Sequence, residues 1–129
     1  MKDRITTARK YMGLHEVNDN AKLKKLLGMN PATTAWCAAF VNAIERDSGS
    51  LGTGKLTARS FLKWGRELKT PEEGCVVILR RGNSSWQGHV AYYLETVGDK
   101  VVLLGGNQDN RVCIKSYPLR DVLGYRAAI

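Results

Sequence analysis

One cysteine lies where a thiol can become reactive. Cys37 stands near the start of a run whose apolar residues, from Ala38 to Ile44, recur at helical spacing, and this run predicts a helix over residues 35–47. The unpaired amides and the dipole at a helix start favour a thiolate and can also bind a developing oxyanion. Cys37 is therefore the candidate nucleophile. The alternative is a small buried hydrophobic side chain, which is the usual role of a free cysteine.

Two histidines are available as bases. His89 follows Gly88 at the point where a glycine-containing loop enters an expected strand. A base on a rigid strand can be held against a nucleophile on a facing helix. For His89 taken alone, a catalytic and a structural role both remain open. For His15, in the loop that follows Gly13, we expect a surface or capping role.

A polar pair ends the strand that follows the His89 strand. The segment from Leu103 to Gln108 contains two glycines and then Asn107. If the hairpin register is simple, Asn107 or Gln108 lies beside His89, where a side-chain carbonyl can accept the imidazole N–H and fix the tautomer. The alternative is that the Gly-Gly-Asn sequence forms only a turn.

The elements that must position these residues change character along the chain. Spacing and capping residues predict four helices: one carrying Ile5, Ala8 and Met12 and stopped by Gly13, one capped by Asp19 or Asn20 and closed by Gly28, one over 35–47 capped by Thr33 or Thr34, and one over 58–65 capped by Thr57. Runs rich in β-branched residues then predict strands over 75–79, 90–97, 101–104, 112–117 and 123–126, with a hairpin turn at 98–100. Helices followed by an antiparallel sheet predict an α+β fold, and we expect residues 1–129 to form one domain.

The composition limits the class of partner. The chain has 20 basic and 12 acidic residues, a formal net charge of +8, which attracts polyanions. The basic residues are scattered without aromatic interleaving, so a nucleic-acid-binding module is a distant alternative. No stretch has the length of a signal-peptide core or a membrane span, which predicts synthesis in the host cytoplasm and no stable membrane insertion. The three cysteines show no metal-site spacing, so we expect free thiols and no metal.

Four segments, in order, resemble those of one protein group. They are Trp36–Val41, Ala58–Gly65, Gly88–Ala91 and Leu104–Gln108, flanked by Tyr11–Gly13 and Leu123–Arg126. In this order they resemble small phage and prophage cysteine peptidases of the NlpC and CHAP papain-like superfamily. The resemblance covers nearly the whole chain, and four ordered motifs are more specific than any one of them.

The resemblance implies a papain-like fold and a thiol hydrolase that acts on the peptide part of bacterial peptidoglycan without a cofactor. Cys37 matches the family nucleophile, His89 matches the base, and Asn107 matches the polar residue that orients the histidine. Gln108 is the less favoured occupant of that last role. One departure is Cys75, which follows a glycine where the family usually has aspartate, and which would add an oxidisable thiol.

The tryptophans divide between groove and core. Trp36 and Trp86 flank the candidate nucleophile and base in sequence, and we expect them, with Gln108, to contact the stem peptide. For Trp36 a place in the core is the alternative. Trp64 has helical spacing and is expected in the core.

Three further residues have expected structural roles. Cys113 lies in an apolar strand and is expected to be buried and inert. Glu16 and Asn20 follow the family pattern, and we expect them to make structural hydrogen bonds.

The expected function is that of a phage or prophage endolysin. It would be a monomeric cysteine endopeptidase or N-acetylmuramoyl-L-alanine amidase that acts on the cell wall after release, with peptidoglycan as its partner and no nucleic acid. A secreted antibacterial amidase toxin, or another papain-like acyltransferase, would keep the same architecture.

Overall fold

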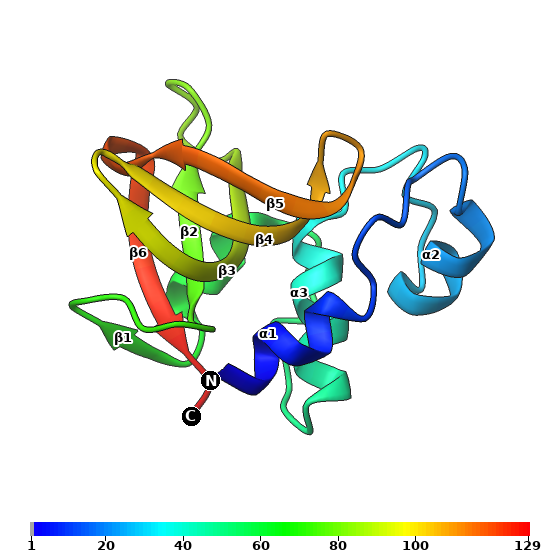
Figure 1. The fold of residues 1–129 in the computed structure, drawn as a ribbon, viewed down its shortest axis with the longest axis horizontal. Helices are drawn as coiled ribbons and strands as arrows, with labels where there is room; N and C mark the ends of the chain where they lie inside the picture. Colours follow the sequence, from blue (N-terminus) through cyan, green and yellow to red (C-terminus); the bar gives the residue numbers. More distant parts are fainter. Residues whose placement is uncertain (1) are drawn as a thin grey trace.

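The computed structural model describes residues 2–129 and has helices on one side and an antiparallel sheet on the other (Figure 1). Three α-helices come first: α1 (Lys2–Arg9), α2 (Asn20–Leu27) and α3 (Cys37–Asp47). They are followed by the 3₁₀ helix η1 (Ala58–Lys63), strands β1 (Arg66–Leu68), β2 (Val76–Arg80), β3 (Gly88–Val97), β4 (Lys100–Gln108) and β5 (Arg111–Pro118), the 3₁₀ helix η2 (Leu119–Asp121) and strand β6 (Val122–Ala127). The expected α+β class is confirmed.

The strands form one sheet in the order β1-β6-β2-β3-β4-β5, and neighbouring strands are antiparallel. Successive side chains of a strand point to opposite faces. Val90 and Tyr92 of β3 therefore pack in the cluster that includes α3, whereas Ala91 and Tyr93 pack in a second cluster on the other face. By the same alternation, His89 belongs to the face of Ala91.

Helix α3 packs directly on the sheet because the facing residues are small. Eight of its 11 residues are buried, and it contacts β3 and β4. Gly106 of β4 must lack a side chain, since a Cβ there would lie 2.6 Å from the Trp36 ring and 2.8 Å from the Cβ of Phe40. The two glycines that end β4 are thus part of the strand, and the alternative that they form only a turn is wrong.

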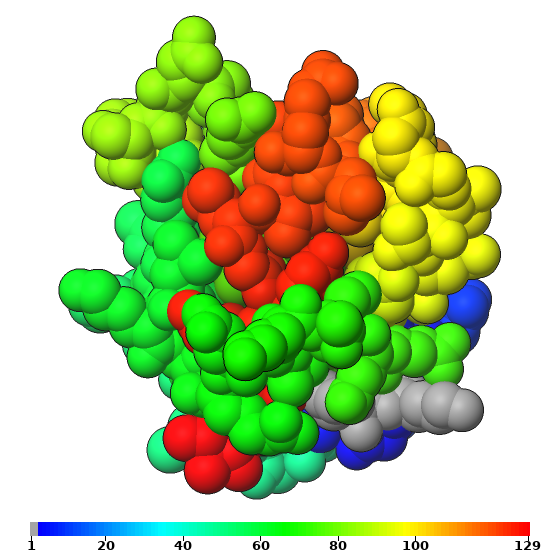
Figure 2. Space-filling model, turned by 90° about the vertical axis from the view of Figure 1, so that its left-hand side faces the viewer, coloured from blue at the N-terminus to red at the C-terminus, as the bar shows by residue number. Residues whose placement is uncertain are grey.

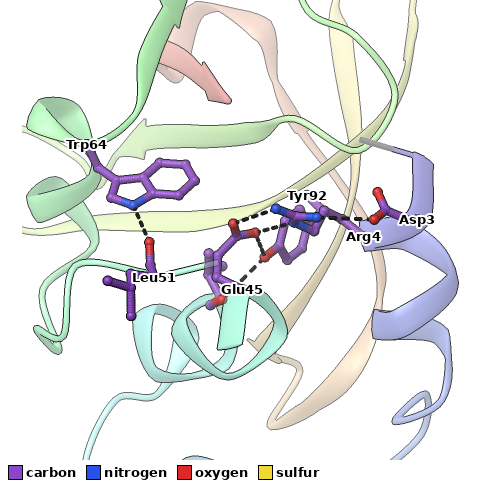
Figure 3. A network of polar contacts seen from close by, with 7 residues as sticks. Asp3, Arg4, Glu45, Leu51, Trp64 and Tyr92 are labelled. Carbon is purple, nitrogen blue, oxygen red and sulfur yellow. Dashed lines mark hydrogen bonds and ion pairs between the residues drawn. The ribbon is translucent and has the colours of Figure 1, made fainter. Parts of the chain in front are cut away.

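A buried charge network ties three elements together (Figure 3). Arg4 of α1 donates from Nε and Nη2 to the two carboxylate oxygens of Glu45 in α3, at 2.8 and 3.1 Å. The hydroxyl of Tyr92 in β3 donates to the same carboxylate at 2.7 Å. Because Glu45 is only 1% exposed, its charge depends on these partners. The network fixes α1 and the sheet against the helix that carries Cys37.

Two tight turns set the register around the site. Gly98, with φ of 59°, begins the turn between β3 and β4, where Val97 pairs with Lys100. Asp109 and Asn110 form the two-residue turn between β4 and β5, with φ of 52° and 64°. Just before that turn, the β4–β5 register shifts between Gly105 and Gln108, and Asn107 has φ of 57°. This bulge changes which side chain faces His89.

Several expected boundaries differ from the structure. The cap by Thr33 or Thr34 is wrong: α3 begins after Trp36, which makes no side-chain capping bond. Neither Asp19 nor Thr57 makes a side-chain capping bond, and the segment expected as a fourth α-helix is the shorter η1. The end of α2 at Gly28, with φ of 74°, is as expected. Strand β1 was not predicted, because its three residues are too few to show an alternating pattern.

Among residues 2–129, no helix combines the length and the apolar character that a membrane span requires.

Candidate active site

Cys37 is the first residue of α3, and its side chain is 5% exposed. The amides of the first helical turn have no partner within the helix, and Trp36 supplies none from its side chain. Burial raises the pKa of the Cys37 thiol, while the backbone amides of Val90, Ala38 and Cys37 itself and the charge of Arg81 act in the opposite direction. The Val90 contribution shows that the thiol lies against β3, at the residue that follows His89.

His89 is held from one side by Gln108. Its Nε2 lies 2.9 Å from Oε1 of Gln108. The Gln108 amide nitrogen donates to the carbonyl oxygens of Cys113, at 2.7 Å, and Leu103, at 3.3 Å. These two bonds orient the amide so that its oxygen faces the imidazole, which makes Nε2 the protonated nitrogen. Nδ1 of His89 is therefore left with a free lone pair.

A glycine makes room for this contact. A Cβ at Gly105 would lie 2.9 Å from Oε1 of Gln108 and 2.6 Å from Cβ of Ala91. Any side chain at Gly105 would therefore push the Gln108 carbonyl away from His89. The two adjacent glycines thus serve different contacts, because Gly106 opens space on the opposite face for α3.

Tyr117 of β5 covers the imidazole. Its ring centroid lies 5.1 Å from that of His89, with the planes inclined by 31°, and its hydroxyl lies 3.2 Å from Nε2. His89 is 3% exposed. Burial lowers the pKa of His89 to about 4, the hydrogen bond with Gln108 raises it, and the charges of Arg81 and Lys115 lower it further. The imidazole is therefore neutral at pH 7.

Nδ1 of His89 is buried and makes no hydrogen bond with any residue of the described chain. The thiol and the imidazole consequently do not share a hydrogen bond in this structure. Cys37 lies on the α3 side of the sheet and His89 on the other side, and both are at the end where β3 begins. An orphaned, buried nitrogen of this kind is uncommon and marks a functional candidate.

Two neighbouring cavities open around these residues. The first, of about 300 Å³, includes Cys37, Trp86 and Gly88 in its wall. The second includes His89, Gln108 and Tyr117. Among the described residues, only Arg81 and Asn107 line both cavities. These two residues therefore form the boundary between the thiol cavity and the imidazole cavity.

Asn107 does not orient the imidazole; that expectation is wrong, and Gln108 makes the contact. The cause is the bulge at the end of β4. The left-handed backbone at Asn107 turns its side chain to the cavity boundary and carries Gln108 into the interior, where it is 1% exposed. Gln108 in this position holds the base, so the expected contact between Gln108 and substrate is also revised.

The tryptophans separate clearly. Trp36 is fully buried and donates from Nε1 to Oε1 of Glu16 at 3.0 Å, so its expected contact with substrate is wrong. Its indole instead packs over Gly106 under α3. Trp86 is 69% exposed and lines the thiol cavity. Trp64 is partly buried against the core and donates to the carbonyl oxygen of Leu51, as Figure 3 shows.

The polar residues of the opening segment have structural roles, as expected. Glu16 accepts the bond from Trp36. Asn20 donates to the carbonyl oxygen of Glu16 and to Oδ1 of Asn30. His15 caps a turn, because its Nδ1 accepts from the amides of Val17 and Asn18.

The other two cysteines differ from expectation. Cys75 is 1% exposed and burial raises its pKa to about 11, so the structure does not support an oxidisable thiol there. Cys113 is only partly buried and lies beside the site, where its Sγ contacts the carbonyl oxygen of Gln108 at 3.2 Å.

Tyr117 and Arg81 were not among the residues predicted from sequence. Strand alternation carries the signal for Tyr117, because Cys113, Lys115 and Tyr117 share one face of β5 and this strand adjoins the one that ends in Gln108. Arg81 lies in the loop between β2 and β3, and its position depends on the loop's path.

In residues 2–129 no three His, Cys, Asp or Glu side chains converge as a metal-binding group. A scan against protein-family models gives no match for this chain, and a search of curated proteins gives none either.

Proposed function

We propose that this chain is a papain-like thiol hydrolase that cleaves an amide bond in the peptide part of bacterial peptidoglycan, as a phage or prophage endolysin. The observation that carries the reaction class is His89, whose Nε2 is committed to Gln108 while its buried Nδ1 has no partner among the described residues. Its chain neighbour Gly88 lines the cavity of Cys37. The wall substrate and the papain-like family rest on the four ordered segments that resemble this superfamily.

The proposed reaction begins with a neutral pair. Nδ1 of His89 accepts the Sγ proton of Cys37 as the sulfur attacks the scissile carbonyl. The carbonyl oxygen becomes an oxyanion and accepts hydrogen bonds from the amides that open α3. The imidazolium then protonates the leaving amine, and a thioester remains on Cys37.

Water completes the cycle. Nδ1 of His89, again neutral, takes a proton from water, whose oxygen attacks the thioester carbonyl. Collapse of the second oxyanion releases the carboxylic acid and returns the proton to Cys37. Both attack steps require sulfur and Nδ1 to approach each other once substrate fills the cavity, since catalytic hydrogen bonds often tighten only in the complex.

The partners of the imidazole support this role. During each transfer His89 becomes an imidazolium, and its Nε2–H still needs an acceptor. The carbonyl of Gln108 supplies one at 2.9 Å, and its amide is itself fixed by the backbone of Leu103 and Cys113. Trp86, exposed at the cavity wall, is suited to cover an extended peptide.

The test is mass spectrometry of muropeptides released from purified sacculi. The wild-type protein should create one new pair of amine and carboxyl termini, which names the cleaved bond. Cys37→Ala and His89→Ala should each reduce the rate by on the order of 10⁴ or more. Cys75→Ala is the matched control, because it removes a thiol from the second cluster, away from both cavities. Unchanged release by Cys37→Ala protein would overturn the proposal.

A further inference from the structure

Arg81 is an unpaired cation at the boundary of the two cavities. Its side chain makes no hydrogen bond or ion pair with residues 2–129, although its charge acts on Cys37, His89 and Tyr117. The loop of residues 81–87 that begins with it projects from one corner of the molecule, beside η2, in the upper left of Figure 2.

The neighbouring cations are already engaged. Arg80 pairs with Asp121 at 3.0 Å, and Lys115 pairs with Asp109 at 2.8 Å. Arg59 donates to the backbone oxygens of the 81–87 loop. These pairs also occupy both carboxylates that line the imidazole cavity, so no acidic side chain of that wall is left for Arg81.

The thiol cavity has one charged residue in its wall, Arg81, among apolar and small neighbours such as Leu56, Ala58 and Trp86. A guanidinium binds carboxylates through two parallel hydrogen bonds, which gives both affinity and direction. Apolar walls beside one such group suit a short peptide that carries a single carboxylate near the bond under attack.

We propose that Arg81 is a specificity residue that binds a free carboxylate of the substrate next to the scissile amide. The substrate class is an acidic peptide with one free carboxylate near the cleaved bond. This carboxylate either branches from the cleaved chain or is its C-terminal carboxylate. This inference rests on the proposed function and adds to it a requirement on the substrate.

The experiment uses a set of synthetic stem peptides in which each carboxylate in turn is replaced by a carboxamide. Wild-type protein should cleave one carboxamide peptide about tenfold or more slowly than its parent, which corresponds to loss of a charge-assisted contact. In Arg81→Gln this ratio should fall to about one. Arg81→Lys should restore part of the ratio, and Arg120→Gln, which removes an exposed guanidinium from η2, should leave it unchanged.

The ratio of the two cleavage rates distinguishes a direct contact between Arg81 and the substrate from the electrostatic effect of Arg81 on the catalytic residues. Loss of Arg81 also removes a charge that acts on Cys37 and His89, but that change affects both peptides of a pair equally. A ratio that stays the same in Arg81→Gln would overturn the inference while leaving the hydrolase intact. If wild-type protein cleaves neither peptide nor sacculi, the proposed function fails. In that case the inference is tested by binding of the same peptide pairs to Cys37→Ala and Cys37→Ala/Arg81→Gln. The ratio of the two dissociation constants then replaces the ratio of rates.

Discussion

His89 and Gln108 are joined at 2.9 Å in the interior of the molecule, and the orientation of the Gln108 amide fixes the tautomer of the imidazole. Tyr117 packs on one face of the imidazole, so the hydrogen bond and this ring contact together fix the ring plane. The only ring nitrogen that remains available is the one a general base needs.

Removal of Gln108 should therefore damage the base more than removal of its neighbour. In Gln108→Ala, both ring tautomers become accessible and Nε2 loses its acceptor. We expect the hydrolysis rate to fall by about 10- to 1000-fold, part of the general-base contribution. Asn107→Ala, the matched control, should reduce the rate much less. Equal losses in the two variants, measured on purified sacculi, would contradict the assignment of the orienting role to Gln108.

The cover provided by Tyr117 should set the acid limb of the pH–rate profile. Desolvation is the largest cause of the low pKa of His89, about 4. Tyr117→Ala admits water, so the pKa should rise toward its ordinary value and the acid limb of kcat/KM should move to higher pH. Tyr117→Phe keeps the ring and should leave the limb in place. A limb that moves equally in both variants would show that the hydroxyl, not the cover, controls the titration.

His89 should also make stability depend on pH. Its pKa is about 6.5 when unfolded and about 4 when folded, so the unfolded chain binds more protons between these values. The contribution is complete above pH 6.5 and is lost as pH falls toward 4, with a decrease of about 2 kcal/mol between pH 7.5 and 5. Urea unfolding across this range should show the slope in wild-type protein. The slope should be smaller in His89→Gln, and equal slopes in the two proteins would show that His89 is not its origin.

The buried pair of Arg4 and Glu45 should be essential for stability. Glu45→Ala leaves the Arg4 guanidinium and the Tyr92 hydroxyl without their common acceptor. We expect a loss of about 3 to 5 kcal/mol in the free energy of unfolding. Glu67→Gln is the control, because the Glu67 side chain is 69% exposed and its ion pair with Arg126 should contribute less than about 1 kcal/mol. Similar losses of unfolding free energy in both variants would mean that the buried network does not contribute more than a surface ion pair.

Much of the fold follows from local patterns. The β-branched runs that become β2, β3, β5 and β6 are bounded by turns, and Gly28 ends α2 as its position indicates. The placement of Cys37 in the first turn of α3 follows from the helical spacing, although the helix begins at Cys37 itself and not at residue 35. Each of these features depends on residues close in sequence.

The incorrect expectations depend on contacts between distant residues. Trp36 is adjacent to the nucleophile in sequence, but Gly106, 70 positions later, provides the space that buries it. The choice between Asn107 and Gln108 depends on a register shift against β5. A bulge moves a strand by one residue and exchanges its faces, and no pattern within β4 reports it.

The turn at Asp109 and Asn110 has a further consequence. Both residues adopt a left-handed backbone that glycine tolerates more easily, so the tip of this hairpin is held under conformational tension only one residue from Gln108. Glycine at position 110 would relax the tip and make the chain easier to fold. It would also make the hairpin more mobile, so the orientation of Gln108 and of the imidazole would be less well defined. The variant would then be more stable but a poorer catalyst.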